Sequence, residues 1–195
     1  MQGRLSNYPL FEPPLELVER GIRNWSKPEA DRYREWLLFV MPERIRSVRR
    51  ILSLPPSREP DILLNVAGAE MAKLLALPES SRMSSPETAN LRGHSITVPA
   101  GPQLTPLSYA LAADLGLLWA DLMVERYPLH WETIRKPKSD VSYNLPVLAG
   151  FEHEMNVDPV RVSATLAIGL LDETRTPTAW ADVDRWWAAQ VQSRS

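Results

Sequence analysis

Hydrophobic residues recur with helical spacing along most of the chain, and several of these segments begin at a proline. Proline suits the first turn of a helix, because its missing N–H would have no partner there. Thr105-Pro106, Asp158-Pro159 and Thr176-Pro177 each place a capping side chain directly before such a proline. The pattern predicts about six helices, over 15–24, between Ser26 and Pro55, and over 61–76, 106–126, 159–171 and 177–192.

Two of these helices carry further signals. Pro42 lies within the second segment and is expected to kink or interrupt it, since proline removes a backbone donor and crowds the preceding turn. The 61–76 segment is apolar nearly all round, which predicts burial on most of its sides. Gly68 in that segment is interpreted as a position of close packing.

The 106–126 segment is the most regular and is predicted to be the central helix. Leucines form one stripe along it, and alanines with Gly116 let neighbouring elements approach closely. Its acidic residues, Asp114, Asp121 and Glu125, lie on one further stripe. We interpret this stripe as the strip that faces water, and an acid/base pair or a set of cation ligands is the alternative.

Alternating residues after this helix predict a small antiparallel hairpin, with strands over 131–135 and 141–151. Pro146 lacks a backbone donor, which favours an edge strand. The serine- and proline-rich stretch 78–102 is interpreted as a long connecting loop and a weak subdomain boundary, with one further strand near 95–98 as an option. The fold class predicted is therefore α+β, predominantly helical, with 1–195 as a single globular domain.

Composition removes several classes of chemistry. The chain of 195 residues has no cysteine, which excludes disulfides, thiolate metal sites and cysteine nucleophiles. Its net charge of −2 lacks the basic excess of a dedicated nucleic-acid binder. No export signal and no stretch of about 18 uncharged apolar residues is visible, so we expect a cytoplasmic protein that does not span a membrane.

The sequence shows no recognisable catalytic motif. Glu152, His153, Glu154 and Asp158 form its densest cluster of potential ligands, but the three histidines lack zinc-enzyme spacing. Neither a nucleophile elbow nor a glycine-rich phosphate loop is present. We therefore predict no catalytic residue, no metal site and no cofactor, and interpret the cluster as helix capping and solvated charge.

Two basic groups remain as candidate binding residues. Arginine suits bidentate contact with carboxylates and phosphates, and aromatic residues are enriched at the centres of interfaces. The arginines crowd one side of the second helix, with Arg44 beside them, and the other group surrounds the tip of the hairpin. The candidate binding residues are Arg46, Arg49, Arg50, Trp131, Arg135, Lys136, Lys138 and Tyr143.

These observations favour a non-enzymatic protein that binds another protein. An inhibitor of the immunity or antitoxin type, or an accessory subunit, fits a chain with surface arginines and aromatics and no catalytic cluster. A hydrolase that depends on carboxylates or a metal is one alternative, and a regulator that associates with nucleic acid is the other. The sequence does not determine the oligomeric state.

Overall fold

The computed structural model describes residues 8–19, 21–83, 87–91, 94–98 and 100–191. Helices dominate it, and three two-stranded antiparallel sheets accompany them among these residues. The predicted helical α+β fold is confirmed. The helices are α1 (Leu15–Val18), α2 (Lys27–Ile51), α3 (Pro60–Leu75), α4 (Pro106–Arg126), α5 (Pro159–Leu171) and α6 (Ala179–Ala188), with short 3-10 helices η1 (Ile22–Asn24), η2 (Pro78–Ser80) and η3 (Glu152–Glu154).

The helix starts follow the predicted caps of α4 and α5, but the predicted Thr176-Pro177 cap is wrong, because α6 begins at Ala179 after Thr178. Thr105 accepts a hydrogen bond from the Ser108 N–H, and Asp158 accepts one from the Arg161 N–H. The hydroxyl and backbone N–H of Ser26 both donate to Glu29 at the start of α2. Each cap satisfies a backbone or side-chain group that would otherwise face water at the helix end.

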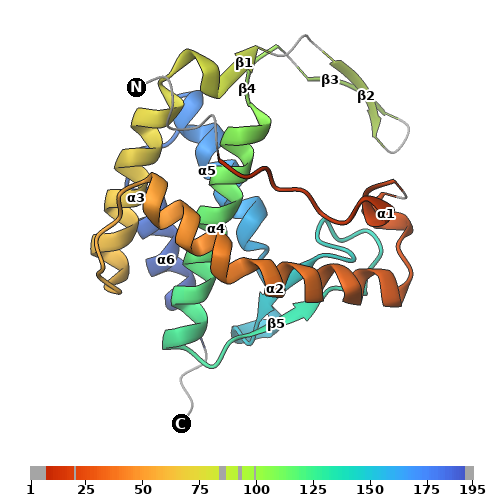
Figure 1. Ribbon diagram of the computed structural model, residues 1–195. Helices are drawn as coiled ribbons and strands as arrows, with labels where there is room; N and C mark the ends of the chain where they lie inside the picture. The colour runs from red at the N-terminus through yellow and green to blue at the C-terminus, as the bar shows by residue number, and fades with distance from the viewer. Residues whose placement is uncertain (1–7, 20, 84–86, 92–93, 99, 192–195) are drawn as a thin grey trace.

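Two further predictions about the helices were wrong in part. The helix α2 is not interrupted at Pro42, which lies on an exposed part of the helix, and of the two expected effects only a bend remains, as Figure 1 shows for α2. The expected helix over 15–24 is divided into α1 and η1, because Gly21 between them has a φ of 69° that a helix cannot continue through.

The helix α4 is the centre of the fold, as predicted. It packs against α5, α2 and α3, and Figure 1 shows it running through the middle of the molecule. Although α4 is long and apolar enough to cross a membrane, 78% of its apolar window is buried inside the fold, as in the core helix of a folded domain.

Glycines let two pairs of elements approach closely. A Cβ on Gly116 would lie 2.3 Å from the Pro159 carbonyl oxygen at the start of α5. A Cβ on Gly68 would lie 1.9 Å from the Pro177 carbonyl oxygen, just before α6, which confirms the predicted close packing. The opposite face of α3 carries the exposed Ile62 and Asn65, so burial on most sides was overestimated.

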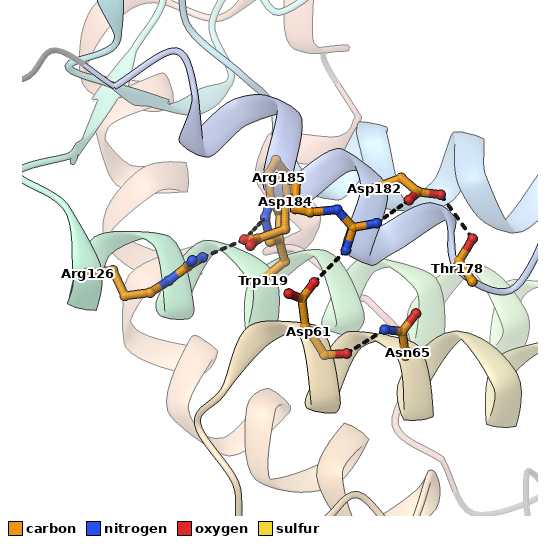
Figure 2. A network of polar contacts seen from close by, with 8 residues as sticks. All are labelled: Asp61, Asn65, Trp119, Arg126, Thr178, Asp182, Asp184 and Arg185. Atoms are coloured by element: carbon orange, nitrogen blue, oxygen red, sulfur yellow. Dashed lines mark hydrogen bonds and ion pairs between the residues drawn. The ribbon is translucent and has the colours of Figure 1, made fainter.

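A polar network fastens α6 to α3 and α4 (Figure 2). Asp184 is buried and accepts hydrogen bonds from Trp119 Nε1, at 3.0 Å, and from the Arg126 guanidinium. Arg185 bridges Asp61 of α3 and Asp182 of its own helix, both at 2.5 Å. Because each buried polar group in this network has a partner, the C-terminal helix is held in one orientation.

The stretch between α3 and α4 forms two nested hairpins, which corrects the expectation of a loop with at most one strand. The strand β1 (Ser81–Met83) pairs with β4 (Pro102–Leu104), and β2 (Glu87–Leu91) pairs with β3 (His94–Val98). Figure 1 shows β2 and β3 standing away from the helices. The optional strand near 95–98 is therefore present, within β3.

The predicted hairpin after α4 is present but shorter than expected. The strand β5 (His130–Thr133) pairs with β6 (Pro146–Ala149), with Thr133 opposite Pro146. Residues 140–145 form turns and not the first half of a strand. Asn144 has a φ of 68°, a left-handed conformation that asparagine tolerates, and this residue ends the turn.

Candidate functional site

The structure does not bring the two predicted basic groups together. Arg135 donates to Asp31 and to the Lys27 carbonyl oxygen, near the start of α2. Arg46 lies 15 residues after Asp31 in the same helix, which places it about 20 Å away along the axis. The arginine group and the hairpin group are therefore separate surfaces.

Several of the predicted binding residues have partners within the chain. Arg46 pairs with Glu43, Arg49 donates to the Pro55 carbonyl oxygen at 3.3 Å, and Arg135 also donates to Asn144. Trp131 packs, partly buried, against the main core. Arg50, Lys136 and Lys138 are exposed, while Tyr143 is half-buried.

The acidic stripe of α4 is not one strip facing water. Asp114 is buried, and its carboxylate accepts hydrogen bonds from Arg44 Nε and the Tyr8 hydroxyl. Burial raises the pKa of Asp114 to about 6, with Arg44 and Tyr8 offsetting part of the rise. Asp121 and Glu125, about two and three turns nearer the end of the helix, pair with Arg58 instead.

Arg44 is likewise buried, although the sequence suggested an exposed arginine flank. Besides Asp114, its guanidinium donates to the carbonyl oxygens of Pro9 and Leu10, at 3.0 and 2.8 Å, and lies over the Phe11 ring. This arginine therefore fastens the segment before α1 onto α2 and α4. Its role is structural.

The ligand-like cluster near 152–158 is dispersed by the fold. Glu152, His153 and Glu154 form the short helix η3, whereas Asp158 caps α5. Across the described ranges, no group of three or more His, Asp or Glu side chains is arranged to hold a metal ion.

A recess surrounds the 140–145 turn. It consists of three depressions that share lining residues, with volumes of about 520, 360 and 360 Å³. Val141 lines the first and third, Ile22 and Leu145 line the second and third, and Asp158 and Arg161 line the first and second. Cavities of this size suit ligands or the anchoring side chains of a partner.

Hydrogen bonds hold the turn in place beside the recess. The buried Asn144 donates from its amide to the carbonyl oxygens of Ile22 and Trp25, at 2.8 and 3.1 Å. Asp140 accepts from the Ser142 N–H at 2.7 Å. The turn is thereby fastened to η1 and to the start of α2, which gives the recess a preformed shape.

Exposed apolar side chains gather on the recess. Ile22, Tyr109, Val141 and Ile168 line it and are 39, 43, 60 and 42% exposed. They come from four parts of the chain: η1, α4, the turn and α5. Exposed apolar groups that cluster around a concave surface mark a site of interaction, whereas single ones do not.

The second depression, here called the tyrosine pocket, also holds polar groups. Tyr33 and Tyr109 line it together with Asp158 and Arg161. Burial raises the pKa of both tyrosines, and the charge of Asp158 adds to the rise. Burial also raises the pKa of Asp158, while the N–H and charge of Arg161 offset part of this effect.

Sequence reasoning identified Asp158 as a helix cap but missed the recess. Its residues are drawn from positions 21–24, 33, 37, 109, 140–146 and 155–168 and from Trp187. The sequence around the recess shows a helix that starts at a proline and an asparagine before Leu145-Pro146. Neither pattern predicts a cavity. Comparisons with known protein families, with curated proteins and with solved structures give no match.

Proposed function

We propose that this protein is a non-enzymatic binding protein that holds another protein at the recess. The observation that carries the proposal is the gathering of Ile22, Tyr109, Val141 and Ile168 around adjoining depressions. An apolar centre with a charged rim is the usual composition of a protein interface. An inhibitor of the immunity or antitoxin type, or an accessory subunit, acts through such a surface.

The rim supports a partner with acidic groups around its apolar anchors. Lys136 and Lys138 are exposed in the segment just before the 140–145 turn, and neither ammonium group has an ion pair within the described part of the chain. Opposite charges on the two partners speed association and fix the orientation in which the two proteins bind. Both lysines were among the binding residues expected from the sequence, and in this proposal they form the rim.

The other functional predictions have no such support. Arg58 pairs with Asp121 and Glu125, and Arg44 with Asp114, so the α4 carboxylates considered for a hydrolase are engaged by arginines. The Glu152–Asp158 cluster, the other candidate, is not arranged to hold a metal ion within the described ranges. The basic groups proposed for nucleic acid lie on separate surfaces. A cytoplasmic location stays a prediction.

A photo-crosslinking residue at Val141, compared with one at Ile62, tests the proposal in cells of the source organism. Both positions are similarly exposed, at 60 and 55%, but Ile62 lies on α3 and outside the recess. We expect a crosslinked protein at Val141 that is absent at Ile62. No crosslink above the Ile62 level would contradict the proposal, and a crosslink to a second copy of this chain would replace it with self-association.

The captured protein is then purified and its affinity measured. We expect Val141→Glu to weaken binding at least tenfold, since a charge is buried at the apolar centre, and Ile62→Glu to leave it unchanged. Equal affinities for the two variants would contradict a role for the recess.

A further inference from the structure

The tyrosine pocket has the dimensions and walls of a site for one long side chain. Its volume of about 360 Å³ is lined by apolar groups of several elements, among them Leu37 of α2 and Ala164 of α5. Leu145 and Pro146 close the side that faces the turn. An aliphatic stem fits such walls, because it has no polar atom that would need a hydrogen-bond partner inside the pocket.

Hydrogen-bonding groups with unused capacity face this pocket. Tyr33 is 8% exposed and lines the pocket, yet its hydroxyl has no hydrogen-bond partner among the residues the structure describes. The hydroxyl of Tyr109 is likewise without one in that part of the chain. Both hydroxyls therefore have hydrogen-bonding capacity that a ligand group in the pocket can use.

Asp158 gives the pocket a negative charge. Its Oδ1 atom accepts from the Arg161 N–H at 3.1 Å, but no cationic side chain hydrogen-bonds to it in the described ranges. Arg161 also lines the pocket, but its side chain is exposed, so water screens its charge more than that of the carboxylate. The charge felt inside the pocket is therefore that of Asp158.

We infer that the tyrosine pocket receives a single arginine side chain of the partner, with the guanidinium bonded to Asp158 and to the hydroxyls of Tyr33 and Tyr109. This inference rests on the proposed function, because it names the anchor that the recess accepts. A guanidinium is weakly hydrated, stacks on aromatic rings and offers five donors, which suits a site of one carboxylate and two phenols. The partner thus presents an arginine within a surface whose rim is acidic.

The inference is tested with two small probes, N-acetyl-arginine methylamide and its uncharged isostere N-acetyl-citrulline methylamide, titrated by NMR. We expect the wild-type protein to bind the arginine probe at least tenfold more tightly than the citrulline probe. Asp158→Asn keeps the helix cap and removes the charge, so it should abolish this preference. Tyr109→Phe keeps the ring and should weaken binding of the arginine probe.

Asp140→Asn is the matched control, because Asp140 lies in the same recess, outside the tyrosine pocket, and caps a turn that asparagine also caps. This variant should keep the arginine preference. Equal binding of the two probes to the wild-type protein, or a preference that persists in Asp158→Asn, overturns the inference.

The two proposals fail in different ways. If the probe preference is absent but Val141 crosslinks a partner, the anchor is wrong and the recess stands. If the preference is present but Val141 crosslinks nothing, the pocket binds cations and the proposed function is wrong.

Discussion

At the level of single residues, neighbouring arginines of α2 have unlike surroundings. Arg44 is 8% exposed and bonded to Asp114 and to two backbone carbonyl oxygens, whereas Arg46 is exposed beside Glu43. Both residues belong to the same arginine-rich stretch of sequence. Their difference arises because Asp114 and the segment at Pro9 and Leu10 pack on one side of the helix.

We expect Arg44→Met to lower the free energy of unfolding by about 3–5 kcal/mol, since it leaves the charge of Asp114 buried without its partner. Arg46→Met removes an exposed pair and should change stability by less than about 1 kcal/mol. Urea denaturation measures both. Similar losses for the two variants would contradict the structural role of Arg44, and the double variant Arg44→Met/Asp114→Leu should recover part of the loss.

The pH dependence of stability tests the environment of Asp158. Because burial raises the pKa of Asp158 above its ordinary value of 3.8, folding favours the protonated form. The stabilisation of the folded state by Asp158 is therefore present at low pH and is lost as the pH rises through the pKa of Asp158 in the folded state. Asp158→Asn keeps the cap but does not titrate.

We expect the stability of the wild-type protein, relative to Asp158→Asn, to fall as the pH rises from 4 to 7. Urea denaturation of both proteins at several pH values measures this difference, in which the other titrating groups cancel. A constant difference would show that the carboxylate is well solvated, and a difference that grows with pH would show that the fold stabilises its charged form, so either result would contradict the expectation.

At the level of elements, local chemistry accounts for where helices start. Asp158-Pro159 and Thr105-Pro106 act within four residues of the cap, so the sequence alone identified the starts of α5 and α4. Pro42 does not interrupt α2, because the cost of a proline depends on what surrounds the helix at that point and this residue is exposed. The alternation over 141–145 was misjudged because Asn144 bonds to Ile22 and Trp25, which are distant in sequence.

Close packing of α4 on α5 depends on Gly116. We expect Gly116→Ala to lower the free energy of unfolding by about 1–3 kcal/mol, because its Cβ would overlap the Pro159 carbonyl oxygen and α5 would have to shift. Gly101→Ala is the control, since a Cβ there meets nothing within 4 Å. Thermal denaturation measures both, and an unchanged Tm for Gly116→Ala would mean that the helices separate at little cost.

At the level of the whole molecule, the helices around α4 and the hairpin of β2 and β3 differ in how far other elements pack against them. The hairpin is a two-stranded sheet that stands away from the helices, whereas α4 is covered by α2, α3 and α5 (Figure 1). Isolated two-stranded hairpins are marginally stable in water. The two regions should therefore open independently.

Hydrogen exchange measured by mass spectrometry tests this expectation. Amides of 87–91 and 94–98 should exchange by local opening, well before the amides in the middle of α4, which require global unfolding. Arg44→Met should speed exchange in α4 and leave exchange in the hairpin unchanged. Equal protection of the two regions would show that the hairpin folds with the core.

The sequence by itself determined the helical α+β class, most helix starts, the central place of α4 and the existence of the hairpin after it. Capping, proline geometry and hydrophobic periodicity act over a few residues and can be read locally. Only the tertiary structure decided that Asp114 and Arg44 are buried together, that the two basic groups lie apart, and that Tyr33, Tyr109 and Asp158 meet in one pocket. Burial and cavities depend on which distant segments pack against each other, and no local pattern carries that information.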